Sequence, residues 1–512
     1  MYNSSITCFS SFLITGGLQM KRKLTALLAA LMAVSTLLAS CSDAENGGST
    51  ETQSPTVTTA AETAAETAEP RILPDLPEIT FSGADFRFYS WDFGDYRVWD
   101  DLYSEEEDGE PINDAVFKRN RTIEEKYEIG ISEKIDLYTD YVTGVLKSVK
   151  SGDDDYEVII SMGHHCVASL YATACYNLND LDYVDFTKPW WDKNALEAFN
   201  FGNFLPFTVS DMIILDKGVT GAVYFNQKLA SDYNLGNLYE EVYNNTWTME
   251  RMAELGHIVS EDLNGSSSWD ENDRYGILGG DDAVIYLFHG SGARMIGKDS
   301  NGMPIATFES ERNFTVIQYY LEELLYDETL RAQTGTISDM FQNNQGLFMF
   351  GALKTANALR EMESDFGILP VPKYDAGQDS YSHSVFTHGG NLISVPVTAK
   401  QLDMIGVILE ALSAESKYTV IPAFYQTVLK DKATRDEQSV DMLDIIIGSM
   451  VFDAGDYYAL GGFNDEFLRI TGSCAHLGMS ERTSDIVSFY KAREKKIDKA
   501  IEQMIKKIEK IG

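Results

Sequence analysis

Residues that could carry out catalysis occur in this 512-residue chain, but none stands in a pattern specific for one reaction. Asp281 and Asp282 form a carboxylate pair of the kind that glycoside hydrolases use. Because the chain has 79 acidic residues, adjacent pairs arise by chance. No Gly-x-Ser-x-Gly elbow, P-loop or His-Glu-x-x-His motif is present. We therefore expect a protein without enzymatic activity and without a cofactor.

Two further segments invite a metal-binding interpretation. His164 and His165 are adjacent, so their side chains point apart, and no third ligand is in view. The alternative is the start of a helix whose histidines are satisfied locally. The acidic loop from Asp262 to Asp273 departs from the EF-hand template, since Ser267 stands at the glycine position and Asp273 replaces the final Glu. We expect no metal at either place.

The chain has five cysteines, too few for a disulfide scaffold. Cys166 and Cys175 lie nine positions apart in a segment of helical character. At a rise of 1.5 Å per residue they would be separated by about 13 Å, which is too far for a disulfide. We expect these two and Cys474 to be free, buried thiols.

The region around Cys41 has the properties of an export signal. Lys21, Arg22 and Lys23 precede an apolar run from Leu24 to Ala39, which is typical of a secretory signal. Leu38-Ala39-Ser40-Cys41 resembles the lipobox of bacterial lipoproteins, which implies cleavage before Cys41 and lipid on its thiol. An ordinary signal with a chance cysteine is the alternative. The apolar run, roughly 16 residues, is shorter than the span of a bilayer.

This interpretation gives a signal peptide over residues 1–40, with Met20 as a possible true start, and a linker over residues 41–78. The linker is rich in Thr, Ala, Glu and Ser and cannot bury apolar surface, so we expect a disordered spacer. The predicted location is the cell surface, with the globular body anchored to the plasma membrane through Cys41.

The charge balance excludes nucleic acid as the default partner. The formal net charge is −38, from 41 basic and 79 acidic residues. Phosphate contacts need a basic face. The same balance disfavours membrane contact beyond the lipid anchor.

The globular body begins with a pattern that predicts a parallel sheet covered by helices. Strands are expected at residues 85–91, 129–135 and 156–161, and helices at 111–127 and 138–151. Further strands are expected at residues 206–215, 222–226, 275–277, 346–351, 366–373 and 388–396. Helices are expected at residues 248–261 and 314–325, from 352 to about 362, and at the C-terminus. The C-terminal helix carries an apolar stripe at Ile497, Ile501, Met504 and Ile508, which we interpret as core packing.

Ligands of such sheets bind at the carboxyl ends of the strands. For the first strand that end is Trp91-Asp92, and for the third it is Gly163-His164-His165. The Trp190-Trp191 pair allows two interpretations, packing in the core or stacking on a sugar ring.

Several blocks of sequence, in this order behind the lipobox, resemble extracellular solute-binding proteins of ATP-driven (ABC) importers, family 1, the sugar-binding type. These blocks are Gly109–Asn120, Tyr224–Leu229, Asn245–Glu250, Arg274–Ile277, Gly367–Tyr374 and Glu415–Tyr418. The resemblance extends from about Ile79 to the C-terminus.

The resemblance implies an α/β, two-lobe periplasmic-binding-protein-like fold, with a ligand cleft between lobes joined by crossing strands. The first lobe would contain residues 79–210 and 390–440, and the second residues 211–389 and 441–512. The crossing strands would lie near Val209–Ile213 and Gly390–Val395. Closure about this hinge would trap the solute.

The expected ligand-binding residues lie in the loops that would border this cleft: Trp91, Asp92, His164, His165, Asp211, Asp281, Asp282, Gly351, Gly390 and Asn391. In maltose-type relatives the loop after the strand matching Leu347–Phe350 carries a tryptophan that stacks on sugar. Here that loop is Gly351-Ala352-Leu353-Lys354, which disfavours a maltodextrin ligand.

The resemblance implies a monomeric binding component that captures a carbohydrate and delivers it to ABC permease subunits in the membrane. A binder of peptide or another polar solute on the same fold is the nearest alternative. A surface scaffold and a glycoside hydrolase are the alternatives from other classes.

Overall fold

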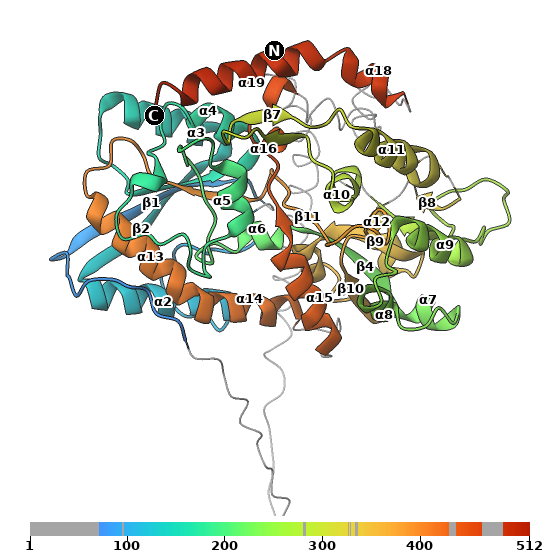
Figure 1. Ribbon diagram of the computed structural model, residues 1–512. Coiled ribbons are helices and arrows are strands. Elements are labelled where there is room, and N and C mark those ends of the chain that lie inside the picture. Colours follow the sequence, from blue (N-terminus) through green and yellow to red (C-terminus); the bar gives the residue numbers. More distant parts are fainter. Residues whose placement is uncertain are drawn as a thin grey trace, which may run out of the picture. The chain divides into compact units, whose positions relative to one another are not determined.

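The computed structural model of the protein describes residues 71–94, 97–279, 283–325, 327, 329–332, 336–429, 437–462 and 485–511 (Figure 1). The predicted signal peptide, Cys41, nearly all of the predicted linker, Asp281, Asp282 and Cys474 lie outside the described residues. The side chains of His164 and His165 also lie outside them. No helix in the described ranges combines the length and the apolar character needed to cross a membrane.

The first sheet has four strands in the order β12-β3-β1-β2. Its members are β1 (Ala84–Asp92), β2 (Ile129–Leu137), β3 (Val158–Met162) and β12 (Asn391–Ser394). β1 pairs in parallel with both β2 and β3, whereas β12 joins β3 in antiparallel fashion. The parallel core of this sheet was expected from the alternation of strands and helices. Its edge strand, however, returns from a part of the chain more than 200 residues later.

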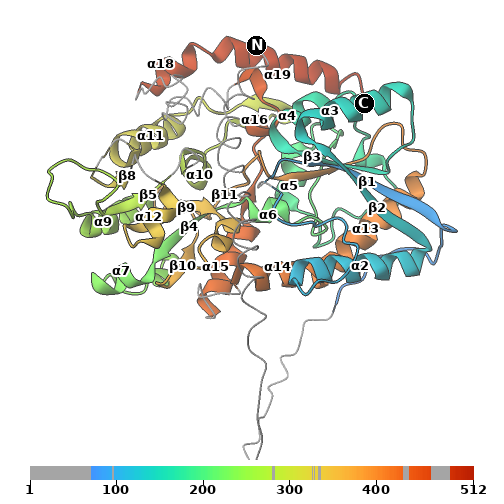
Figure 2. The same ribbon diagram turned by 180° about the vertical axis from the view of Figure 1, so that it is seen from behind.

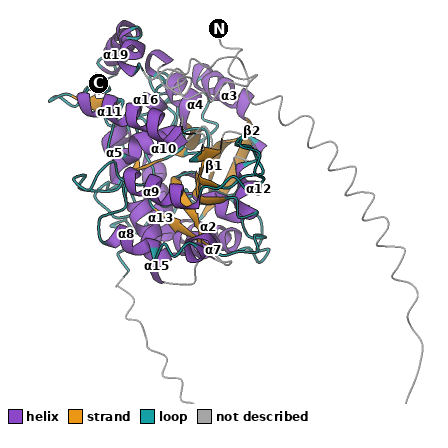
Figure 3. Cartoon of the chain, turned by 90° about the vertical axis from the view of Figure 1, so that its right-hand side faces the viewer, coloured by secondary structure: helices purple, strands orange, loops and turns teal. Residues whose placement is uncertain are grey.

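Two helices lie on opposite sides of this sheet, α2 (Pro111–Tyr127) and α3 (Tyr138–Ser151) (Figures 1 and 3). Both match the predicted ranges because local signals define their ends. Pro111 opens α2, where a missing N–H costs nothing. Gly152 closes α3 with a φ of 74°, a conformation that glycine adopts without strain.

The second sheet has five strands in the order β10-β4-β9-β5-β8. They are β4 (Gly221–Asn226), β5 (Tyr275–Leu278), β8 (Arg331–Ala332), β9 (Gly346–Ala352) and β10 (Phe366–Leu369). The central strand β9 is antiparallel to β4 and parallel to β5. Two short pairs complete the strands: β6 (Ile296–Lys298) with β7 (Pro304–Ala306), and β11 (His383–Ser384) with β13 (Met450–Val451).

The remaining helices surround these sheets (Figures 1 and 2). Those before residue 300 are α4 (Gly163–Leu170), α5 (Lys193–Phe199), α6 (Leu215–Gly218), α7 (Gln227–Asp232), α8 (Leu238–Tyr243), α9 (Met249–Val259) and α10 (Ala283–Gly290). Those after it are α11 (Glu311–Tyr319), α12 (Ile337–Gln342), α13 (Leu402–Tyr418), α14 (Val420–Leu429), α15 (Glu437–Gly448), α16 (Ala454–Tyr457), α18 (Ile486–Lys491) and α19 (Glu494–Ile508). Short 3-10 helices lie at Leu178–Asp180, Leu353–Asn357 and Leu460–Gly462, and α11 continues as a π-helix over Tyr320–Leu325.

The strand expected at residues 206–215 is absent, and this prediction was wrong. Only isolated bridges occur, from Thr208 to Ile393 of β12 and from Ser210 to Trp191, and the chain then turns into α6. The turn depends on Asp101, whose Oδ2 accepts the backbone N–H groups of Ile214 and Leu215 at 2.9 and 3.2 Å. This cap comes from a distant part of the chain, so local periodicity could not reveal it.

The helix expected from residue 352 to about 362 is also shorter than predicted. Only Leu353–Asn357 is helical, and it is a 3-10 turn. The hydroxyl of Tyr224 donates to the carbonyl oxygens of Ala352 and Leu353 and accepts the N–H of Ala356. These bonds hold the segment in a tight turn against β4.

The chain crosses from one sheet to the other through α6, where a group of charged residues is buried. Asp216 is fully buried, and its Oδ1 has no hydrogen-bond partner among the described residues. The Nζ atom of Lys217 lies 3.5 Å from Asp216 Oδ2 and 3.6 Å from Asp211 Oδ1. Burial raises the pKa of Asp216 to about 7. Asp216 therefore changes charge near neutral pH at the point where the two sheets are joined.

The C-terminal helix α19 packs against two regions, one around β7 and Leu460–Gly462 and the other at Tyr171 beside α4. The predicted stripe of Ile497, Ile501, Met504 and Ile508 is buried, as expected. Toward its start the helix lies over β7 and the 3-10 turn at Leu460–Gly462, and Lys507 near its end lies 5.2 Å over the ring of Tyr171, just after α4. Figures 1 and 2 show α19 running across the sheets from the side of α18 to the side of α4.

Ile497→Ala should lower the free energy of unfolding by about 2–4 kcal/mol, because it leaves a cavity beneath α19. Lys499→Ala on the exposed face of the same helix is the control and should change it by less than about 0.5 kcal/mol. Denaturant unfolding followed by circular dichroism measures both. Equal effects of the two substitutions would contradict the packing of this stripe.

The free energy of unfolding of Asp216→Asn should increase relative to that of wild type as the pH rises from about 5 to about 8. The folded-state pKa of Asp216 lies above its usual value, so its contribution to stability is full at low pH and is lost as the pH rises through about 7. Asparagine has no such loss. Denaturant unfolding at both pH values, with exposed Asp232→Asn as the control, measures the difference. A pH-independent difference between wild type and Asp216→Asn would refute the expectation.

Candidate binding site

Four of the expected site residues lie at the edge of the first sheet where β1 and β3 end: Trp91, Asp92, Gly390 and Asn391. The indole N–H of Trp91, at the end of β1, donates to Oδ1 of Asn391 at 2.9 Å. The backbone N–H of Gly163 donates to the carbonyl oxygen of Gly390 at 3.2 Å. The antiparallel return of β12 therefore brings residues that are 300 positions apart to the edge where β1 and β3 end.

This edge is closely packed in the structure. Trp91 is 1% exposed and Asn391 is 6% exposed, so the indole ring belongs to the core. A Cβ atom at Gly163 would lie 2.7 Å from the ring of Tyr457, which covers the edge. Asp92 is half-buried, and its Oδ1 accepts the N–H of Gly94 at 2.9 Å. Ligand contact by these residues stays a prediction.

The other expected site residues are dispersed. Asp211 lies beside Lys217 and Lys417 near the crossing segment, and burial raises the pKa of Asp211. Gly351 lies in β9, where a Cβ would come within 3.0 Å of Thr355 Oγ1 and 3.3 Å of the Tyr224 ring. Nothing is described for Asp281 and Asp282 or for the side chains of the two histidines in α4.

Three other sequence interpretations concern buried groups. Trp190 and Trp191 are 1% and 3% exposed, which confirms the core interpretation, and Trp191 donates to Glu410 Oε2 at 2.9 Å. Cys166 and Cys175 are free and buried, as expected, and burial raises the pKa of each thiol to about 12. In the loop from Asp262 to Asp273 the carboxylates accept backbone N–H groups of the loop itself.

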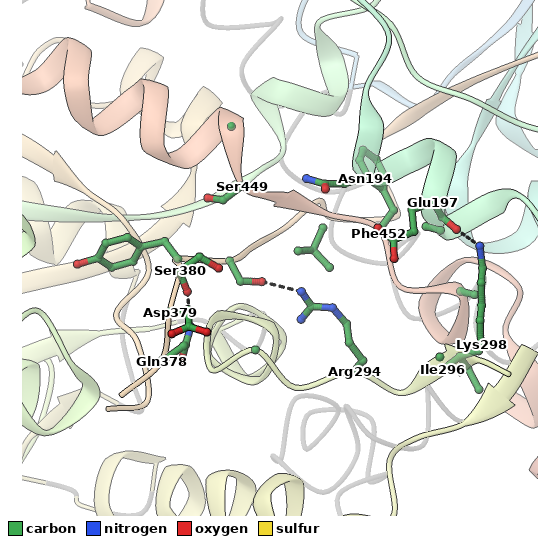
Figure 4. A pocket seen from close by; sticks show the side chains of 18 of the residues that line it. Asn194, Glu197, Arg294, Ile296, Lys298, Gln378, Asp379, Ser380, Ser449 and Phe452 are labelled. Carbon is green, nitrogen blue, oxygen red and sulfur yellow. Dashed lines mark hydrogen bonds between the residues drawn. The ribbon is translucent and has the colours of Figure 1, made fainter. Parts of the chain in front are cut away.

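The structure contains a cavity of about 770 Å³ at a different place (Figure 4). Ligand pockets commonly have about 300–1,000 Å³. Four segments line it, within residues 194–201, 292–298, 378–382 and 448–454. No member of the expected set of site residues lines this cavity among the residues that the structure describes.

The cavity is bordered by segments that lie outside the two larger sheets but connect to them along the chain. α5, which supplies Asn194, follows a stretch that pairs with the first sheet: Asp192 donates to Val209 O, and Thr208 exchanges hydrogen bonds with Ile393 of β12. The segment at residues 292–298 follows β5 and α10, and the segment at 378–382 follows β10 of the second sheet. Residues 292–298 are also joined directly to the end of α5, since Nζ of Lys298 donates to the carbonyl oxygens of Glu197 and Asn200.

An extended segment places alternate side chains along one wall. Residues two apart in an extended chain point to the same face, so Arg294, Ile296 and Lys298 all face the cavity. Asp453 fixes this segment: its carboxylate accepts the N–H of Met295 at 2.6 Å and of Ile296 at 3.2 Å.

The opposite wall is held by a buried histidine. His383 Nε2 accepts the N–H of Val371 at 3.0 Å, so the ring must be neutral with its hydrogen on Nδ1. Nδ1 then donates to Oγ of Ser449 at 2.8 Å, and Ser449 lines the cavity. Burial lowers the pKa of His383 to about 3, so this arrangement is insensitive to pH above about 4.

The lining offers polar groups together with aromatic rings. Asn194 donates its amide to Met450 O at 2.7 Å, and Gln378 donates to Gly290 O at 2.7 Å. Phe201, Tyr381 and Phe452 are the aromatic members. Figure 4 shows Asn194, Ser380 and Ser449 around the same space as Arg294 and Lys298. A polar ligand with one less polar face fits this combination.

The sequence reasoning missed these residues because they come from loops and short strands. The alternation of Arg294, Ile296 and Lys298 was the one available signal, and the strand involved, β6, is only 3 residues long. A stretch of that length does not show a reliable period.

Comparison with known proteins gives a clear result for structure alone. No family model and no curated protein matches the sequence. Among solved structures, the sugar-binding protein MalE from Xanthomonas citri is 12% identical, with 84% of this chain and 100% of that chain covered and a TM-score of 0.54. A cyclo/maltodextrin-binding protein complexed with maltotetraose is 12% identical over 83% of this chain and 98% of that chain, with a TM-score of 0.53.

An ABC substrate-binding protein from Listeria monocytogenes, solved with cycloalternan, is also 12% identical. The match covers 82% of this chain and 99% of that chain, with a TM-score of 0.50. At such low identity the likeness concerns the backbone arrangement alone. It agrees with the two sheets and the crossing segment described above. The chain therefore has the two-lobe, periplasmic-binding-protein-like α/β fold of sugar-binding ABC substrate-binding proteins.

Proposed function

We propose that this protein is the substrate-binding component of an ABC importer and that it captures an extracellular carbohydrate. The observation that carries the proposal is the cavity of about 770 Å³, whose lining segments connect along the chain to both sheets. The similar structures support it, since those proteins are described as binding maltotetraose and cycloalternan. The function is binding and release, and it requires no chemical step.

The cavity suits a sugar for chemical reasons. Sugar hydroxyls need several planar or hydroxyl donors and acceptors, and the lining provides Asn194, Gln378 and Ser380. The apolar face of a sugar ring needs an aromatic surface, which Tyr381 can supply because it is half-buried at the cavity. The volume accommodates a mono- or oligosaccharide.

Ligand capture follows from the position of the cavity. α5 approaches from the side of the first sheet, whereas residues 292–298 and 378–382 approach from the side of the second. A hinge movement through the crossing segments would widen or narrow the space between them. The closed, liganded form is the state that a permease would recognise.

The proposal places the protein outside the cell, attached to the plasma membrane through lipid on Cys41. The linker that follows Cys41 would let the globular body reach the permease subunits. Several fatty chains would hold it firmly, since one chain gives only marginal binding. The protein would act as a monomer, without contact to nucleic acid.

Gly448→Trp tests the cavity as the binding site. A Cβ at Gly448 has nothing within 4 Å, so the backbone tolerates a side chain, and the indole would fill part of the cavity. Gly130→Trp in β2 is the matched control, because a Cβ there meets only Asp85 Oδ1 at 3.6 Å. The measurement is a thermal-shift screen of the whole chain against mono- and oligosaccharides, with short peptides included.

We expect at least one sugar class to raise the melting temperature of wild type and of Gly130→Trp but not of Gly448→Trp. A ligand at 100 times its dissociation constant adds roughly 2.7 kcal/mol of stability. Sugar binding that is retained in Gly448→Trp would indicate that the sugar binds at the sheet edge near Trp91 and Asp92 and not in the cavity. A response to peptides alone would replace carbohydrate as the ligand class.

Cys41→Ser should abolish labelling of the protein by fatty acid and release it from the membrane fraction of the producing cell. Cys8→Ser, which changes a cysteine ahead of the predicted signal, is the control and should leave labelling intact. Membrane fractionation and fatty-acid incorporation measure both. Continued labelling of Cys41→Ser would refute the lipid anchor.

A further inference from the structure

The guanidinium of Arg294 has no carboxylate partner, although it is half-buried in a strongly acidic protein. It donates to three groups: the carbonyl oxygens of His289 at 3.3 Å and Ala293 at 2.7 Å, and Oγ of Ser382 at 3.0 Å. No ion pair within 4.0 Å joins it to a carboxylate among the described residues. Burial lowers the pKa of Arg294, which reflects the cost of a charge without an ionic partner.

The hydrogen bonds of Arg294 leave one side of its guanidinium free. Both hydrogens of Nη1 are used on backbone carbonyls, and Nη2 uses one on Ser382. Nε makes no hydrogen bond to any described residue. Nε and Nη2 form the lateral fork of the guanidinium, and a carboxylate binds such a fork through two parallel hydrogen bonds.

Lys298 adds a second cation on the same wall. It lies four residues beyond Arg294 in an extended segment, so both side chains face the cavity, as Figure 4 shows. Its Nζ donates to the backbone carbonyl oxygens of Glu197 and Asn200, the latter at 2.7 Å, and lies 5.1 Å over the ring of Phe201. It forms no ion pair within 4.0 Å among the residues described.

The carboxylates nearby are engaged elsewhere or face solvent. Glu197 and Asp379 line the cavity and are exposed at their positions. Asp453 accepts the N–H groups of Met295, Ile296 and Gly455. Asp456 lies 2.8 Å from Nε2 of His289. The charge of Arg294 is favoured from a distance by Asp453, Asp456 and Glu197, and its lateral fork stays open.

We propose that the cavity binds an acidic sugar, a uronic acid or an oligosaccharide that carries one, with its carboxylate on Nε and Nη2 of Arg294 and within the field of Lys298. This inference rests on the proposed function and narrows the carbohydrate to one class. A guanidinium fork binds carboxylates and phosphates through the same paired hydrogen bonds, so sulfated and phosphorylated sugars are tested separately. Tyr381, which is half-buried, lies on the same cavity for the ring of the sugar.

The test compares three forms of one sugar on the wild-type whole chain by isothermal titration calorimetry: oligogalacturonate, its methyl ester, and the neutral galactose oligomer of equal length. The glucuronate series is run in parallel. We expect the acid to bind at least 10-fold more tightly than the ester, since hydrogen bonds to a charged group exceed those to a neutral one. Sulfated and phosphorylated sugars form a further arm.

Arg294→Gln should weaken binding of the acid by about 10- to 100-fold and so remove most of the preference for the acid over the ester. Arg294→Lys keeps the charge without the fork and should give an intermediate loss. Arg312→Gln is the control, because Arg312 lies 3.9 Å from Asp375 and outside the cavity lining. Circular dichroism confirms folding of each variant, and the ester comparison on wild type needs no variant.

Equal binding of acid, ester and neutral sugar would overturn this inference and leave the proposed function intact. Preference for sulfated or phosphorylated sugars over the carboxylate would overturn it as well. Binding of no sugar in either series would overturn this inference, and the screen of mono- and oligosaccharides described above would then decide the proposed function.

Discussion

The carboxylate of Asp453 holds the parts of the cavity in place. It is 2% exposed and accepts the backbone N–H groups of Met295, Ile296 and Gly455. The hydrogen bonds to Met295 and Ile296 fix the segment that carries Arg294 and Lys298. The hydrogen bond to Gly455 caps α16, which packs against α4 at the edge of the first sheet. Burial raises the pKa of Asp453, and the hydrogen bonds from Met295 and Gly455 oppose this shift by favouring the charged carboxylate. Nδ1 of His289 lies 4.0 Å from its Oδ2.

The fold was predictable wherever local signals and tertiary packing agree. Pro111 and Gly152 define the ends of α2 and α3, and the stripe beginning at Ile497 defines the buried face of α19. The errors at residues 206–215 and 352–362 have a common cause. Asp101 caps α6 and Tyr224 holds the turn after β9, and each acts on a segment more than 100 residues away.

The candidate site was less predictable than the fold. The rule that ligands bind at the carboxyl ends of parallel strands pointed to Trp91 and Gly163, whereas Asn391 reaches Trp91 because β12 joins the sheet antiparallel, which the rule does not cover. The rule says nothing about side-chain packing, and Tyr457 fills the space over Gly163. The cavity itself is built from α5, a 3-residue strand and the ends of loops, whose meeting depends on contacts such as Asn194 with Met450. No sequence period encodes such a meeting.

The course of α19 limits how the two parts of the molecule can move. A helix is stiff along its axis, and this one lies over β7 near its start and over Tyr171 near its end. Its two supports cannot separate unless one of them slips along the helix or detaches. A hinge movement of the proposed kind would have to keep both supports at nearly constant distance. The C-terminal helix, far along the chain from the crossing segment at α6, would then favour rotations about an axis close to α19.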